Sequence, residues 1–181
     1  MPLLFCAALA TGCSKNEASV TPENQVSNGD IRNRDGGGNV CNDATVTLLA
    51  GQTIPAGNIV VEQDATNIYV TYNTTDGWVL SATHLYVGAC ATIPVNPPGN
   101  PIPGQFPYNA THNNVTSYTV TIPVSVIGLN NCGCVAAHAV VKKLSATGSV
   151  LSSQSAWGQG TVINPQGSWG MKFDFCAVDC D

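Results

Sequence analysis

Apolar and polar residues alternate with a period of two along most of the chain after residue 39. In the segment Asn67–Asn73, Ile68, Val70 and Tyr72 fall on one face of an extended strand. No window shows the 3.6-residue period of an amphipathic helix. The same alternation predicts further strands over Thr45–Leu49, Asn58–Gln63, Trp78–Val87, Ser117–Pro123, Cys134–Leu144 and Gly170–Cys176.

Turn-forming residues separate these segments. Asp76-Gly77 stands between two predicted strands, which is the sequence signal of a tight β-hairpin. Many short strands with frequent turns indicate two antiparallel sheets packed face to face. We therefore expect residues 39–181 to form a single all-β domain, a two-sheet antiparallel β-sandwich of immunoglobulin-like or jelly-roll-like type.

One connection in this domain is unusually long. Ala91–Asn114 contains six prolines, and proline lacks the amide proton that a sheet ladder needs. The segment is predicted to be one long Pro-rich loop, ordered and held by Phe106 and Tyr108. Two interpretations stay open, a flap that closes one end of the sandwich and a loop that contacts a ligand.

The N-terminus has the pattern of an export signal. Leu3–Ala10 is apolar, which is too short to span a membrane, where about 20 residues are needed, but long enough for a signal-peptide core. The following Gly12-Cys13 resembles a bacterial lipoprotein signal, although Ala10 stands where leucine is usual and no basic residue precedes the run. The resemblance implies cleavage after residue 12 and acylation of Cys13; an ordinary secretory signal is the alternative.

The segment after Cys13 has the composition of a tether. Residues 14–38 are polar, end in Gly36-Gly37-Gly38 and show no sustained apolar periodicity. Such a segment does not bury enough apolar area to offset the entropy of ordering it. We expect residues 13–38 to be an acylated cysteine followed by a flexible linker, holding the domain to the bacterial outer membrane or cell surface.

The chain has 8 cysteines, and six of them lie in the expected domain. An even number in an exported domain predicts disulfides, and the pairing stays open. Cys132 and Cys134 are expected to take different partners because the ring between them would be strained. Cys41 with Cys176 or Cys180 is expected to clamp the ends of the domain, and Cys90 completes the set. A zinc site is the competing use, but the paired Cys-x-x-Cys spacing is absent.

Charge is scarce in this chain. Only 9% of its residues are charged, against about 25% in an ordinary soluble domain, and the net charge is −5. A chain so poor in lysine and arginine has no electrostatic basis for binding nucleic acid. The apolar content of 44% also argues against general disorder.

Motifs that would indicate chemistry are weak. Trp157–Thr161 matches the last-strand motif of antibody variable domains, but the accompanying Cys and Trp spacing is missing. His84, His112 and His138 invite a Ser-His-Asp triad, yet no Gly-x-Ser-x-Gly elbow accompanies them. The aspartates do not have calcium-loop spacing. We therefore predict no catalytic residue, metal or cofactor.

Four segments carry a resemblance to a family. They are GWVLSATHLYVG, GNPIPGQFPY, VTSYTVTIP and CVAAHAVVKKL, which begin at Gly77, Gly99, Val115 and Cys134. In this order they resemble a recurring domain of exported Bacteroidota-type lipoproteins. The resemblance implies a single exported β domain and brings no activity or site residue with it.

Three functions are consistent with these features. The first is an envelope-anchored binding or adhesion module for glycans or envelope proteins, whose contact candidates are Trp157, Trp169, Phe106 and Tyr108, since aromatic rings stack on sugars. The second is a structural envelope or filament subunit that assembles through strand edges. The third is a small secreted hydrolase that uses His84 or His138 with an aspartate. The expected partners are a membrane, reached through the lipid on Cys13, and a glycan or envelope protein.

Overall fold

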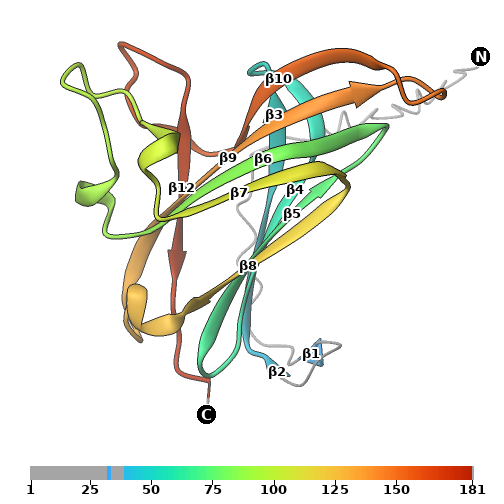
Figure 1. Ribbon diagram of the computed structural model, residues 1–181. Coiled ribbons are helices and arrows are strands. Elements are labelled where there is room, and N and C mark those ends of the chain that lie inside the picture. Colours follow the sequence, from blue (N-terminus) through green and yellow to red (C-terminus); the bar gives the residue numbers. More distant parts are fainter. Residues whose placement is uncertain (1–31, 34–38, 181) are drawn as a thin grey trace, which may run out of the picture.

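The computed structural model describes residues 32–33 and 39–180 and shows an all-β domain (Figure 1). The predicted signal peptide, Cys13 and most of the predicted tether lie outside the described residues. Within the described part, the only helices are three 3-10 turns of 3 residues each, and no helix has the length and apolar character to cross a membrane. The all-β prediction is confirmed.

The strands are β1 (Arg32–Asn33), β2 (Asn39–Val40), β3 (Asn42–Ala50), β4 (Ile54–Gln63), β5 (Asn67–Thr74), β6 (Trp78–Gly88), β7 (Tyr108–Val115), β8 (Ser117–Pro123), β9 (Cys132–Leu144), β10 (Val150–Gly158), β11 (Thr161–Val162) and β12 (Met171–Cys176). Seven of the strands coincide with the segments predicted from the alternation, namely β3, β4, β5, β6, β8, β9 and β12. The 3-10 turns are η1 (Cys90–Thr92), η2 (Pro103–Gln105) and η3 (Val124–Val126).

Ten of the strands form one continuous antiparallel sheet, and β1 and β2 pair separately from it. Its ladder runs β11-β12-β9-β10-β3-β4-β5-β8, and β6 pairs with both β9 and β7. The long strand β9 joins three neighbours, because β12 pairs with its first residues and β10 with its last, while β6 follows its other edge. The sheet curls into a nearly closed, barrel-like form that is open between β7 and β8, so the predicted two-sheet sandwich is not confirmed.

Side chains on the inner face of the curled sheet form the main core. Successive strand residues point to opposite faces, so alternate residues of β5 and β9 enter this core. Tyr72 and Ile68 of β5 and Val141 of β9 are fully buried there. The hydroxyl of Tyr72 donates a hydrogen bond to the carbonyl oxygen of His84 at 3.3 Å, which links β5 to β6 across the core.

A second, smaller core lies on the other face of β6, β9 and β10. It contains Tyr86, Ile93, Phe106, Cys134, Ala136 and Trp157, with Ile163, Trp169 and Met171 packed against it. The Pro-rich connection between β6 and β7 and the segment between β11 and β12 both contribute to this cluster. The Pro-rich connection is therefore packed over the outer face of the sheet and does not close one end of a sandwich, although Phe106 is buried as the flap interpretation expected.

Five strands and one connection differ from the prediction, since β1, β2, β7, β10 and β11 have no counterpart among the predicted segments. The Pro-rich loop ends at Pro107, because the polar stretch Tyr108–Val115 pairs with β6 as β7. β10 was not predicted because its serines and glutamine show little apolar alternation. Asp76 and Gly77 do form a tight turn with positive φ angles of 52° and 75°, but the predicted hairpin is wrong. β5 pairs with β4 and β8, and β6 pairs with β7 and β9. In the predicted tether, β1 pairs with β2.

Three disulfides join the six cysteines of the domain. They are Cys41–Cys180, Cys90–Cys134 and Cys132–Cys176. Cys132 and Cys134 take different partners, as expected, and Cys41 pairs with Cys180 to hold the two ends of the domain together. The other two bridges join the start of β9 to η1, which follows β6, and to β12.

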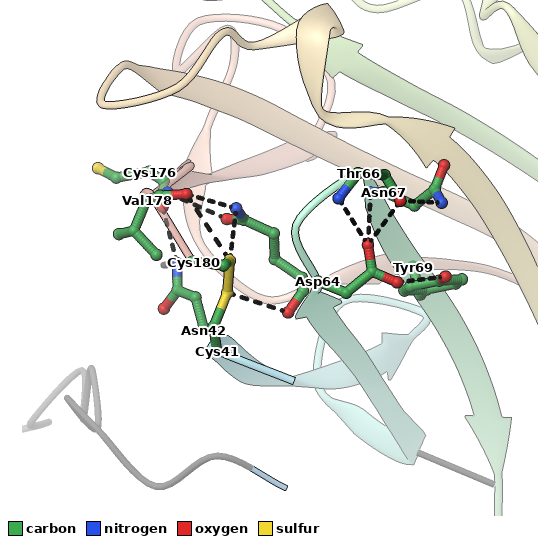
Figure 2. Close-up of a disulfide and its surroundings, with 10 residues drawn as sticks. Cys41, Asn42, Asp64, Thr66, Asn67, Tyr69, Cys176, Val178 and Cys180 are labelled. Carbon is green, nitrogen blue, oxygen red and sulfur yellow. Dashed lines mark hydrogen bonds between the residues drawn. A yellow bond between two sulfur atoms is a disulfide. The ribbon is translucent and has the colours of Figure 1, made fainter. Parts of the chain in front are cut away.

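Polar contacts fix the chain around the Cys41–Cys180 bridge (Figure 2). Asn42 donates a hydrogen bond to the carbonyl oxygen of Cys176 at 2.7 Å, which holds the C-terminal segment against β3. In the turn between β4 and β5, Asp64 accepts hydrogen bonds from the backbone of Thr66 and Asn67 and from the hydroxyl of Tyr69. Burial alone raises the pKa of Asp64, but these hydrogen bonds outweigh it and leave the pKa below its ordinary value.

Candidate functional site

Two of the four predicted ligand-contact aromatics are enclosed in the second core. Phe106 is 2% exposed and Trp157 is 5% exposed. Their rings meet edge to face with centroids 6.2 Å apart, and Tyr86 contacts Phe106 at 6.0 Å. Such edge-to-face contacts add to the stability gained by burying the rings. Phe106 and Trp157 therefore hold the Pro-rich connection against the sheet and present no free ring face to a ligand.

Trp169 lies beside a surface hollow. The hollow has a volume of about 360 Å³, within the range of small-ligand sites. Trp169 is half-buried and packs against the second core, so its ring is held in place by the protein. The hollow brings together the turn after β3 and the β11–β12 connection, and its lining residues are Gln52, Val162, Asn164, Pro165, Gly167, Ser168 and Trp169.

Hydrogen bonds between two loops fix one wall of this hollow. The side-chain amide of Asn164 donates to the carbonyl oxygen of Pro98 at 2.8 Å and to Asn100 Oδ1 at 2.9 Å. Asn100 Oδ1 also accepts from the backbone N–H of Ser168 at 2.8 Å. A Cβ atom on Gly167 would overlap the side chains of Asn100 and Asn164, so glycine is required for this close approach. The Pro-rich connection therefore holds the loop that lines the hollow in place through these hydrogen bonds.

The lining of the hollow is neutral and polar. None of its seven residues carries an ionisable side chain. The side chains of Gln52 and Ser168 and the indole N–H of Trp169 have no hydrogen-bond partner within residues 39–180, so they are free to bind a ligand. A rigid aromatic ring beside neutral hydrogen-bonding groups suits an uncharged polar ligand with one apolar face.

Tyr108, the fourth predicted contact residue, lies at a different place. A second hollow of about 240 Å³ is lined by Tyr108 and Asn109 of β7 and by Tyr118 and Val120 of β8, with Pro107 beside them. It occupies the opening of the sheet, where these two strands are not paired with each other. Burial raises the pKa of Tyr108, so its hydroxyl is neutral and hydrogen-bonding near neutral pH.

The histidines form two separate groups. His84 and His138 stand directly opposite each other on β6 and β9, and their Nδ1 atoms are 3.1 Å apart. His138 Nε2 is 3.3 Å from Ser155 Oγ, and its ring packs against Trp157 at 4.8 Å. His112 lies apart from them, with its Nε2 2.9 Å from Thr83 Oγ1 and its ring beside Tyr118.

The row Ser155–His138–His84 has the connectivity of a hydrolytic triad but not its electrostatics. Burial, followed by the charge of the neighbouring His84, lowers the pKa of His138 to about 3. A general base works best with a pKa near the working pH, so His138 is a poor one. His84 would repel a protonated His138, whereas the aspartate of a triad stabilises it. Within residues 39–180, no hydrogen bond joins an aspartate to any of the three histidines.

One group of three potential metal ligands occurs in the described residues. Cys90, Cys134 and Asp174 offer ligand atoms within 4.8 Å of one another. Both sulfur atoms belong to the Cys90–Cys134 disulfide, and a disulfide sulfur is not a thiolate ligand. In the oxidised protein this group is therefore structural.

Several residues of these sites were not predicted from the sequence. Gln52, Asn100 and Asn164 lie in turns, where asparagine and glutamine are common and carry no signal of their own. Ser155 belongs to β10, which was not predicted. Trp169 and Tyr108 were named in advance, and each lines a hollow.

Comparison with known proteins finds no matching family model, no matching curated protein and no matching solved structure.

Proposed function

We propose that this protein is a non-catalytic binding module for neutral glycans and that the hollow at Trp169 is its ligand site. The observation that supports this most directly is the hollow itself, which combines a fixed indole ring, unpartnered polar groups and an uncharged lining. A sugar ring has an apolar face of C–H groups and an edge of hydroxyls. The ring of Trp169 can stack on the face, while Gln52 and Ser168 bond the hydroxyls.

The rigidity of the site supports the same proposal. The Asn164 and Asn100 contacts fix the loop before Trp169, and the second core holds the ring from below. Groups that are already in place lose little entropy when a ligand binds, which strengthens binding for a given contact area. A volume of about 360 Å³ suits one or two sugar rings.

We propose further that the domain acts at the bacterial cell envelope, anchored by a lipid on Cys13. The supporting observations are the apolar run before Gly12-Cys13, the polar segment that follows, and three disulfides, which are typical of an oxidising compartment. Incorporation of labelled palmitate into the wild-type chain but not into Cys13→Ser tests this anchor. Equal labelling of both would contradict it.

A glycan array with the oxidised full chain tests the ligand class. We expect binding to neutral glycans, with no preference for sulfated or sialylated ones. For the best ligand, Trp169→Ala should weaken binding by about tenfold or more, because a central aromatic anchor is lost. Tyr108→Ala in the second hollow is the matched control and should bind as the wild type does. Loss of binding in Tyr108→Ala with retention in Trp169→Ala would move the site and overturn the proposal.

The strand edges support a second candidate function. β7 and β8 each pair with one strand only within the described residues, and the sheet is open between them. An unpaired edge accepts an extended strand from another chain, as in filament assembly. Sedimentation at high protein concentration, combined with electron microscopy, tests this role; assembly into filaments would favour it over the glycan module, and a monomer at every concentration would remove it.

A further inference from the structure

The pairing of β6 with β9 brings two imidazole rings together on the outer face of the sheet. His84 and His138 are register partners, with ring centroids 5.1 Å apart and Nδ1 atoms 3.1 Å apart. His138 is buried and His84 is half-buried, so the pair is reached from solvent at the His84 side. Without a metal ion, one Nδ1–H donates a hydrogen bond to the other Nδ1 across this distance.

The distance between the two Nδ1 atoms matches a shared metal ion. Imidazole nitrogens bind Zn²⁺ at about 2.0–2.1 Å. The two nitrogen atoms are then about 2.9 Å apart if the N–metal–N angle is a right angle, and about 3.4 Å apart if it is tetrahedral. The observed 3.1 Å falls between these values, so both rings can reach one ion without a change of the backbone.

Ser155 orients one of the two ligands. With the proton on Nε2, His138 donates to Ser155 Oγ at 3.3 Å and presents the lone pair of Nδ1 toward His84. Histidines that bind metals commonly donate their other ring N–H in this way, which fixes the tautomer and the ring orientation. The half-buried His84 can place its own ring proton on Nε2, and both lone pairs then converge.

We propose that His84 and His138 form a two-nitrogen binding site for a divalent transition-metal ion. No third histidine, cysteine, aspartate or glutamate of the described residues joins the pair, so water or an external ligand fills the remaining positions. Neutral imidazoles suit Zn²⁺, Ni²⁺ and Cu²⁺, and the general affinity order of divalent metals makes Cu²⁺ the tightest binder. Ser155 is a positioning residue that acts through His138.

The test is a titration with CuCl₂ and ZnCl₂ by calorimetry. The protein is the oxidised full chain without an affinity tag, carrying Cys6→Ser and Cys13→Ser to remove thiols outside the described domain. We expect one Cu²⁺ per chain, bound more tightly than Zn²⁺, and nitrogen hyperfine structure in the electron paramagnetic resonance spectrum of the copper complex. The absence of saturable uptake would overturn the proposal.

Three histidine variants decide where the ion binds. His84→Ala replaces a half-buried side chain and should abolish the one-equivalent uptake while the fold is kept, as judged by circular dichroism. His138→Ala should do the same. His112→Ala is the matched control, since His112 contacts Thr83 and not the pair, and it should bind as the wild type does. Unchanged uptake in His84→Ala, or loss in His112→Ala, would contradict the site.

A fourth variant tests the role of Ser155. Ser155→Ala should weaken Cu²⁺ binding by about tenfold and leave the stoichiometry at one, because loss of an outer hydrogen bond commonly lowers metal affinity by that amount. The conservative Ser155→Thr should restore the affinity. Equal affinity in the wild type and Ser155→Ala would remove the positioning role.

Discussion

The buried side-chain amide of Gln63 holds the backbone of Val178 through two hydrogen bonds. Gln63 Nε2 donates to the Val178 carbonyl oxygen at 2.7 Å, and Gln63 Oε1 accepts from the Val178 N–H at 3.1 Å. Gln63 is fully buried at the end of β4, and Val178 precedes Cys180 in the C-terminal segment. The segment around Val178 has no secondary structure, and the amide of Gln63 satisfies the N–H and C=O groups of Val178 as a neighbouring strand would.

Replacing this amide should destabilise the domain. We expect Gln63→Leu to lower the free energy of unfolding by about 2 kcal/mol, because two hydrogen bonds are lost and two backbone groups of Val178 are left without partners. Urea denaturation of the oxidised protein measures this. Gln105→Leu, at an exposed position of η2, is the matched control and should change stability by less than about 0.5 kcal/mol. Equal effects of the two variants would show that the Val178 contact contributes nothing.

The Cys41–Cys180 and Cys132–Cys176 disulfides should contribute about equally to stability. Cys41–Cys180 closes a separation of 139 residues, and Cys132–Cys176 closes one of 44. While Cys90–Cys134 and Cys132–Cys176 are intact, however, they shorten the path from Cys41 to Cys180 to about 55 residues, and in the chain-entropy model each loop then contributes about 4 kcal/mol. The double variants Cys41→Ala/Cys180→Ala and Cys132→Ala/Cys176→Ala should therefore have similar stability.

The comparison of these two variants by thermal and urea unfolding has a clear contrary outcome. If the Cys132–Cys176 variant were the less stable, local packing at the start of β9 would dominate over loop length. Mass spectrometry under non-reducing conditions should confirm that the two remaining bridges are formed in each variant.

Acid should destabilise the protein through His138. Its pKa is lowered from 6.5 to about 3, mainly by burial. Between these values the unfolded chain binds a proton that the folded chain does not, so stability is full above pH 6.5 and falls as the pH decreases toward 3. Between pH 7 and pH 4, the free energy of unfolding should fall by roughly 3 kcal/mol because of this group. Urea denaturation at a series of pH values measures this. The free energy of unfolding of His138→Gln should depend less steeply on pH, whereas the control His112→Gln should keep most of the wild-type slope.

The close contact of Gly167 with the neighbouring loop should be needed for the shape of the hollow. Gly167→Ala places a methyl group against Asn100 and Asn164, and overpacking of this kind costs about 1–3 kcal/mol. We expect weaker binding of the best array glycan together with a lower melting temperature. Gly104→Ala is the control, because no atom lies within 4 Å of its Cβ position. Glycan affinity that survives Gly167→Ala unchanged would show that the loop wall does not shape the site.

A strand could be predicted where its buried and exposed faces give alternating apolar and polar residues in the sequence. In β5, buried Ile68, Val70 and Tyr72 alternate with half-buried residues, and the period of two is plain. β7 carries asparagines, threonine and histidine and β10 mostly serines, with little apolar alternation, so neither gave a signal. The closure of the sheet could not be predicted either. A tight turn at Asp76-Gly77 has the same local sequence whether or not β5 and β6 pair with each other.

The sites could be predicted only in part for a similar reason. Trp169, His84 and His138 were named from residue type alone. Their neighbours Gln52 and Ser155 come from other strands or turns, and only the pairing of β3, β10 and β9 brings them close. Contacts of this range depend on register, which a single sequence does not specify.

The Cys41–Cys180 bridge also determines how the domain responds to mechanical force. A pull on the chain before Cys41, balanced by one on the chain beyond Cys180, passes directly through the covalent bond. The strands between the two cysteines lie in a closed loop and carry none of that tension. A domain held at one end and stretched at the other would thus keep its curled sheet, its hollow and its histidine pair intact up to the load that breaks the sulfur–sulfur bond, unless a reductant opens the bridge first.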